Sequence, residues 1–208
     1  MLIGGGGHCK SVLDAALRST KYSEIAIVDP ALSAGTSIFG CLVAGNDDAL
    51  FTLREQGFGD AFITVGSIDQ TSLRRELAEK AAGMGFHFPV IADPSAVVST
   101  SAAIGDGTFI GKNTVVNADA VIGYHCILNS GSIAEHECTV GDFTHISVGT
   151  VLCGGVHVGA DAFIGAGVMV KHGIQIGDHS LIGIGSVVLD DIPSGAKAYG
   201  NPCKVIEK

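Results

Sequence analysis

An aliphatic residue recurs at every sixth position from Val98 to Val188, without a single insertion. A strand alternates with a period of two and a helix with a period of about 3.6, so neither explains this repeat. A chain that forms one flat strand, turns a corner and repeats does explain it, and three such sides close a triangular coil. The repeat therefore predicts a left-handed parallel β-helix of the hexapeptide type, with the aliphatic residues inside. These residues are Val98, Ile104, Ile110, Val116, Ile122, Leu128, Ala134, Val140, Ile146, Leu152, Val158, Ile164, Val170, Ile176, Ile182 and Val188.

The corners of this coil are expected at the Gly or Asn that often follows an aliphatic position, as Gly105, Gly111 and Asn117 do. We expect these types there because they tolerate a positive φ. The period ends after Val188, and we expect residues 190–203 to cap the open end of the coil.

Residues 1–91 carry a different pattern, in which short apolar segments alternate with amphipathic ones. This alternation favours a small parallel α/β sheet of the Rossmann type. We expect the chain to divide into a Rossmann-like domain, residues 1–91, and a β-helix with its cap, residues 92–208. The expected strands are residues 2–3, 24–29, 37–43, 60–65 and 86–91, and the expected helices are residues 10–18, 47–56 and 71–82.

The composition limits the partners. The net charge is −9 and no Lys/Arg cluster stands out, which argues against a nucleic-acid partner. No apolar run reaches the roughly 18 residues of a membrane span, and no signal peptide precedes the first expected strand. The six cysteines lack CxxC spacing, so we expect free thiols in a reducing compartment. We expect a cytoplasmic protein that does not insert into membranes.

A glycine turn lies where the first expected strand meets the first helix, at Gly4–His8. Backbone N–H groups at such a turn can bind phosphate, helped by the helix N-terminus. Asp29 ends the next strand, the usual place for a ribose contact. Gly66–Ser67 ends another strand at the same edge, and Arg74 or Arg75 follows close behind. A nucleotide site is therefore indicated, and a purely structural turn is the alternative.

His136 stands out among the histidines of the coil because Glu135 and Glu137 flank it. A carboxylate bonded to one imidazole nitrogen fixes the tautomer and raises the basicity of the other nitrogen. That arrangement suits a general base acting on an amine or a hydroxyl. The alternative is an ordinary surface histidine among acids.

Metal binding is the competing use of these histidines. His136 and His172 are two coils apart, a spacing that resembles the zinc ligands of γ-class carbonic anhydrases. Those enzymes carry a further histidine where this chain has Gly177, so we expect no metal.

The glycine turn ending at His8, the segment Glu135–Glu137, His145 and the tail Gly200–Pro202 together resemble one family. It is the PglD/NeuD-like family of bacterial sugar acyltransferases, and the resemblance covers essentially the full chain. It implies a homotrimer that binds acetyl-CoA in grooves between neighbouring coils, and a nucleotide sugar on the small domain. The implied reaction acetylates the 4-amino group of a UDP-linked 4-amino-4,6-dideoxy sugar, for bacterial glycan biosynthesis.

The resemblance also implies roles for individual residues. His136 matches the catalytic base of the family and Glu137 the carboxylate that raises its basicity. His145 matches a cofactor contact, and Ala166 and Ile184 match backbone contacts to CoA. The positions that match the nucleotide-sugar site are Gly6, Gly7, His8, Asp29 and Gly66.

We expect direct transfer from acetyl-CoA to the acceptor, with a backbone N–H near Gly154 stabilising the oxyanion. Cys138 is the one candidate for a covalent route. Pro30, Ser67–Ile68 and Cys203 depart from the family pattern, and the first two leave the sugar and base specificity open. An O-acetyltransferase acting on sialic acid or another sugar hydroxyl is the main alternative, and a non-catalytic scaffold that binds nucleotide sugars is the other.

Overall fold

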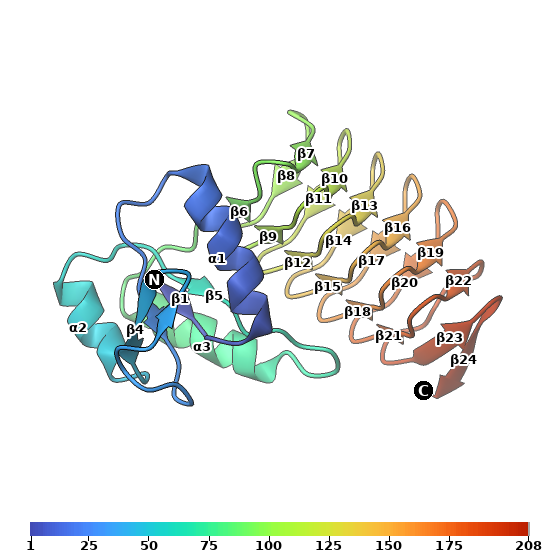
Figure 1. The fold of residues 1–208 in the computed structure, drawn as a ribbon. Helices are drawn as coiled ribbons and strands as arrows, with labels where there is room; N and C mark the ends of the chain where they lie inside the picture. The colour runs from blue at the N-terminus through green and yellow to red at the C-terminus, as the bar shows by residue number, and fades with distance from the viewer. Residues whose placement is uncertain (208) are drawn as a thin grey trace.

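The computed structural model describes residues 1–207. Figure 1 shows a small α/β domain at one end of a long parallel β-helix, with the C-terminal strands at the opposite end. The predicted fold class is confirmed. None of the helices in these residues is long and apolar enough to cross a lipid bilayer.

The coil has three flat faces, each a ladder of short strands. The first face consists of β7 (Val97–Val98), β10 (Val115–Val116), β13 (Ile133–Ala134), β16 (Val151–Leu152), β19 (Met169–Val170) and β22 (Val187–Val188). The second face consists of β8 (Ala103–Ile104), β11 (Val121–Ile122), β14 (Thr139–Val140), β17 (His157–Val158) and β20 (Gln175–Ile176). The third face consists of β6 (Ile91–Ala92), β9 (Phe109–Ile110), β12 (Ile127–Leu128), β15 (His145–Ile146), β18 (Phe163–Ile164), β21 (Leu181–Ile182), β23 (Lys197–Gly200) and β24 (Cys203–Glu207).

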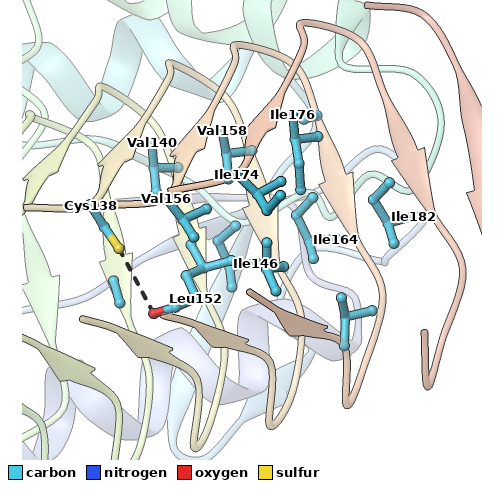
Figure 2. Close-up of a cluster of buried hydrophobic side chains, with 14 of the residues drawn as sticks. Cys138, Val140, Ile146, Leu152, Val156, Val158, Ile164, Ile174, Ile176 and Ile182 are labelled. Atoms are coloured by element: carbon cyan, nitrogen blue, oxygen red, sulfur yellow. Dashed lines mark hydrogen bonds between the residues drawn. The ribbon is translucent and has the colours of Figure 1, made fainter. Parts of the chain in front are cut away.

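Each strand of the repeat pairs in parallel with the strand 18 residues further on, as Ile146 does with Ile164 and Ile164 with Ile182. The aliphatic residues therefore stack in rows inside the coil, and Figure 2 shows Val140 and Val158 adjacent in one such row. Most of these side chains belong to one continuous buried core, against which Ile104 packs partly buried. Val98 was expected inside but is 37% exposed, because it lies on the first coil, where no preceding turn of the first face covers it. Burial of such rows is the main stabilising term of the coil.

The expected reason for the corner glycines is wrong. The left-handed residue of each corner lies three positions after the inward residue, as at Gly131 (φ 69°) and Glu137 (φ 61°). The glycine directly after an inward residue has no positive φ, but it has no room for a side chain. A Cβ on Gly105 would lie 2.6 Å from the backbone carbon of Gly123 on the next coil. Close approach between coils, not backbone conformation, selects glycine there.

The small domain has a five-stranded sheet in the order β3-β4-β2-β1-β5. All its neighbouring strands are parallel except β3 and β4. The strands are β1 (Leu2–Ile3), β2 (Ile27–Val28), β3 (Ser37–Ile38), β4 (Cys41–Gly45) and β5 (Phe62–Ile63), and the helices are α1 (Gly7–Ser19), α2 (Ala49–Glu55) and α3 (Ser72–Gly83).

Two of the expected strands in this domain are wrong. Residues 37–43 form a hairpin of β3 and β4 instead of one strand, because Phe39 (φ 49°) and Gly40 (φ 86°) make a tight turn between them. Residues 86–91 form no strand of the small sheet, and His87 makes only an isolated bridge with Asp60. Pro89 lies in the middle of that segment and has no N–H to donate. The division after residue 91 stays a prediction; β6, which spans it, pairs with β9 of the coil.

The small domain packs on the third face. The α1 residues Val12 and Leu13 share a buried cluster with Phe109 of β9 and Ile127 of β12, and Figure 1 shows α1 crossing this end of the coil. At the other end, Ala196 and Ala198 are fully buried against the coil core, so the C-terminal segment covers it as expected.

Candidate active site

His136 and Glu137 form the turn between β13 and β14, where the first face meets the second. Nδ1 of His136 lies 3.1 Å from Oε2 of Glu137. A carboxylate only accepts hydrogen bonds, so Nδ1 carries the proton and the lone pair of Nε2 is free. The His136 side chain is 58% exposed in the single chain. The pair has the geometry of a general base and the acid that orients it.

Glu135 plays a different part from Glu137. Its Oε2 accepts hydrogen bonds from the side-chain amide of Asn117 (2.9 Å) and from the backbone N–H of His136 (3.3 Å). Glu135 therefore fixes the backbone of the turn, and Glu137 orients the imidazole ring.

Gly154 lies directly beneath the imidazole ring, one coil beyond His136. A Cβ on Gly154 would lie 2.5 Å from Cε1 of His136 and closer still to Nε2. The ladder between these coils uses the Gly155 N–H, which donates to the His136 carbonyl (2.9 Å), and the Gly154 carbonyl, which accepts from Gly173 (3.1 Å). Among the described residues no acceptor pairs with the Gly154 N–H, so it can serve a ligand beside Nε2.

Cys138 is fully buried. Its Sγ lies 3.2 Å from the carbonyl of Cys153 and 3.8 Å from that of Leu152 (Figure 2). Burial raises the pKa of this thiol. A buried thiol held in the protonated form cannot attack a thioester, which favours direct transfer.

His145 lies on β15, away from His136, at the junction of the two domains. Its Nδ1 lies 2.9 Å from the Ser67 carbonyl and its Nε2 lies 2.8 Å from Nδ2 of Asn129. The carbonyl can only accept, so Nδ1 is protonated and Nε2 accepts from the amide. Burial, partly offset by the hydrogen bond to Ser67, lowers the pKa of His145 to about 4. The imidazole is therefore neutral at physiological pH.

The glycine turn of the small domain is the N-terminus of α1. The helix begins at Gly7, earlier than the expected Lys10, with Gly6 as its N-cap and neither a side-chain cap nor an acid in its first turn. A Cβ on Gly6 or Gly7 would meet nothing within 4 Å, so this surface is open. Free N–H groups at a helix N-terminus suit a phosphate.

The other predicted nucleotide residues surround this turn. The carboxylate of Asp29 accepts hydrogen bonds from Gly5 N–H (2.6 Å) and Ala31 N–H (2.8 Å), so it also shapes the turn that it was expected to complement. Gly66 lies beside His8, and a Cβ on Gly66 would lie 4.0 Å from that of His8. Burial, together with the nearby His145 and Arg74, lowers the pKa of His8 to about 3.

Ala166 and Ile184 lie one coil apart on the turn from the third face to the first. Gly185 N–H donates to the Ala166 carbonyl (2.9 Å), and Ile184 is 77% exposed. The predicted residues thus form three groups in one chain. His136 lies on one corner, Ala166 and Ile184 on a second, and His145 with the small domain on the third face.

Sequence reasoning named Asn117 only as a corner residue, and it did not single out Asn129 or the role of Arg74. Asn117 precedes Glu135 by one coil of 18 residues, a spacing that predicts their contact. Asn129 and Arg74 act across the turn or the domain junction, and no local pattern marks them.

A hollow in the small domain and the distribution of possible metal ligands bear on the predicted site. A hollow of about 400 Å³ lined by Tyr22, Gln56 and Asp60 lies at the amino ends of the small domain's strands. Nucleotides bind at the carboxyl ends of such sheets, where the glycine turn lies. Within residues 1–207, no three or more His, Cys, Asp or Glu side chains are grouped to hold a metal ion.

The fold and this site define a hexapeptide-repeat acyltransferase with a Rossmann-like domain. A family model described as the PglD N-terminal domain matches residues 1–81. A GDP-perosamine N-acetyltransferase from Caulobacter crescentus, solved with CoA and GDP-perosamine as a variant with one histidine replaced by alanine, is 38% identical. The match covers 100% of this chain and 96% of that chain, with a TM-score of 0.93.

Two further solved structures are similar to this chain over nearly its full length. The acetyltransferase domain of PglB from Neisseria gonorrhoeae FA1090, in complex with acetyl coenzyme A, is 35% identical over 99% of this chain and 97% of that chain, with a TM-score of 0.92. WeeI from Acinetobacter baumannii AYE, at 23% identity over 99% of this chain and 98% of that chain, has the same fold (TM-score 0.85). The chain belongs to the PglD/NeuD-like family of hexapeptide-repeat sugar acyltransferases, which confirms the predicted family and enzyme class.

Proposed function

We propose that the protein transfers the acetyl group of acetyl-CoA to the 4-amino group of a nucleotide-linked 4-amino-4,6-dideoxy sugar, in bacterial glycan biosynthesis. The observation that carries this is the His136–Glu137 pair above Gly154, in a chain that is 38% identical to a GDP-perosamine N-acetyltransferase. The sequence resemblance implies a UDP sugar and this relative uses a GDP sugar, so the nucleotide is decided by experiment.

In the proposed reaction the amine nitrogen of the acceptor attacks the thioester carbonyl of acetyl-CoA. Nε2 of His136 accepts the proton that the nitrogen loses, while the Glu137 carboxylate holds Nδ1–H and stabilises the imidazolium. A histidine variant of the Caulobacter enzyme still binds CoA and GDP-perosamine, which fits a histidine that acts in the reaction rather than in binding.

The tetrahedral intermediate carries its negative charge on the former carbonyl oxygen. The backbone N–H of Gly154, the residue whose Cβ position faces Nε2, has no partner among the described residues and is the proposed donor to this oxygen. When the C–S bond breaks, the imidazolium returns its proton to the CoA sulfur. The products are the acetamido sugar and CoA thiol, and no residue of the enzyme is acylated.

We further propose a homotrimer in which one subunit supplies His136 and the neighbour supplies the third face with His145. Within one chain these groups lie on different sides of the coil. The outward row of the first face, next to the His136 corner, is entirely apolar. An apolar face of this kind marks a protein interface. The row consists of Val97, Val115, Ile133, Val151, Met169 and Val187.

The nucleotide sugar is proposed to bind at the carboxyl edge of the small sheet. The α1 N-terminus at Gly6 and Gly7 holds the diphosphate, Asp29 the ribose, and the segment at Gly66 together with His8 the sugar. Ala166 and Ile184 line the acetyl-CoA groove through their backbone. The six cysteines are free thiols, which fits a cytoplasmic location.

The test is CoA-thiol release from acetyl-CoA with parallel acceptors. The acceptors are UDP- and GDP-linked 4-amino-4,6-dideoxy sugars and free sialic acid. Release with one of the amino sugars alone is expected, and the preferred nucleotide follows from the better acceptor. Release with sialic acid alone would make the protein an O-acetyltransferase, and binding of both ligands without release would make it a scaffold.

A further inference from the structure

Arg74, in the first turn of α3, is a buried cation without a carboxylate partner among the described residues. Its side chain is among the largest of those fully buried, and the residue is 2% exposed. The guanidinium donates to the carbonyls of Phe143 (3.0 Å) and His125, and it lies 5.6 Å from the centre of the Phe143 ring. The carboxylate within reach, Asp161, pairs with the neighbouring Arg75.

Stability does not explain this arrangement. A cation buried without an opposite charge destabilises a fold, and an apolar side chain of similar volume is commonly the better choice. The first turn of a helix is also its positive end, which repels a cation. Burial lowers the pKa of Arg74 to about 10, so the side chain is still charged at neutral pH.

The contacts of Arg74 point to the loop that joins β5 to α3. Its NH1 lies 3.5 Å from Oγ of Ser67, and the carbonyl of the same Ser67 accepts the hydrogen bond from Nδ1 of His145. Ser67 is thus fixed from two sides, by α3 and by the coil. The two carbonyls that hold Arg74 belong to turns on successive coils, at His125 and Phe143, and not to the loop itself.

We propose that Arg74 is a positioning residue for the acceptor substrate, which fixes the Gly66–Ser67 segment in the arrangement that binds the nucleotide sugar. The inference rests on the proposed function, because it assigns the acceptor to that segment. This role requires the planar guanidinium of arginine, because one side chain must reach two carbonyls and the Ser67 hydroxyl at once. Lys cannot span these three groups.

The experiment compares Arg74→Met and Arg74→Lys with the matched control Arg75→Met. Arg75 lies on the same helix and also joins the two domains, through a partly buried ion pair with Asp161, but no hydrogen bond links it to Ser67 among the described residues. Initial rates of CoA-thiol release give separate KM values for nucleotide sugar and for acetyl-CoA. We expect Arg74→Met to raise the nucleotide-sugar KM about tenfold or more, as for loss of hydrogen bonds from a charged group, and Arg74→Lys to recover part of this. The acetyl-CoA KM should stay within about twofold in both variants, and Arg75→Met should lower the Tm with both KM values nearly unchanged.

Two results would show that Arg74 only holds the two domains together. One is an equal rise of both KM values in Arg74→Met, and the other is the same rise of the nucleotide-sugar KM in Arg75→Met. If Arg74→Met does not fold, the KM ratio of Arg74→Lys decides in the same way. If the wild-type enzyme releases no thiol with any nucleotide-linked amino sugar, the proposed function fails instead. Calorimetry then tests the inference alone, by measuring how tightly UDP and GDP bind to the wild-type protein and to Arg74→Lys. Equal affinities of the two proteins for each nucleotide would overturn the inference.

Discussion

Replacing Gly154 with Ala should displace the imidazole ring of His136, the proposed base, while leaving its chemical groups unchanged. The backbone of Gly154 is not in the left-handed region, so alanine is allowed there. The new Cβ would lie 2.5 Å from Cε1 of His136, whereas non-bonded carbons rest about 3.5–4.0 Å apart. The ring must therefore move by about 1 Å or more. Because the His136 side chain is 58% exposed in the single chain, the ring can move outward with little cost to the folding of that chain.

The consequence for catalysis is large because proton transfer depends on the position of Nε2. A misplacement of about 1 Å costs about 100-fold in rate. We expect kcat of Gly154→Ala to fall about 100-fold, with the acetyl-CoA KM changed by less than about threefold, since alanine keeps the N–H group.

The assay is steady-state CoA-thiol release, accompanied by the Tm. Gly83→Ala is the matched control, because a Cβ on Gly83, at the end of α3, would meet nothing within 4 Å. A Gly154→Ala enzyme with kcat within about threefold of wild type and an unchanged Tm would refute the placement of His136 over Gly154 as the catalytic arrangement.

Three further predictions follow from the same geometry. His136→Ala should lower kcat by about 1,000-fold while the Kd for acetyl-CoA, measured by calorimetry, stays nearly unchanged; a fully active variant would rule out His136 as the base. Cys138→Ala should keep kcat within about threefold, and loss of turnover with a folded protein would revive the covalent route. His8 and His145 are neutral in the folded state, with pKa values lowered to about 3 and about 4, so their contribution to stability is lost as pH falls below their unfolded pKa of about 6.5. Denaturant unfolding should show that the two histidines together lower the free energy of unfolding by on the order of 4 kcal/mol between pH 7 and pH 5. About half of this decrease should be absent in His145→Gln. A free energy of unfolding that does not change with pH would contradict the burial of both rings.

The coil was predictable because its signal is repeated and local. Each six-residue unit places one inward residue, and sixteen units in one register leave no other regular structure. The segment around His136 was predictable for the same reason, because its acids are its sequence neighbours. The structure adds which acid touches the ring, a choice between Glu135 and Glu137 that depends on side-chain direction at a left-handed residue.

The surroundings of His145 and Arg74 could not be predicted, because they depend on contacts between distant parts of the chain. His145 is bonded to Ser67 across 78 residues, and Arg74 to Phe143 across 69. Neither partner carries a periodic or motif-like mark, so only the packing of the small domain on the third face creates these contacts. The hairpin at Phe39 escaped prediction because that residue type seldom adopts positive φ.

The exposure of His136 bears on how the proposed site is completed. A developing oxyanion is stabilised best where water is excluded, yet the His136 side chain is 58% exposed in one chain. The apolar outward row of the first face adjoins this corner, whereas the third face beside the small domain already has part of its apolar row covered by α1. A neighbouring subunit seated on the first face would cover that row and the His136 corner together. Burial of the interface and exclusion of water from the base would then be one event, which ties the proposed chemistry to the proposed trimer.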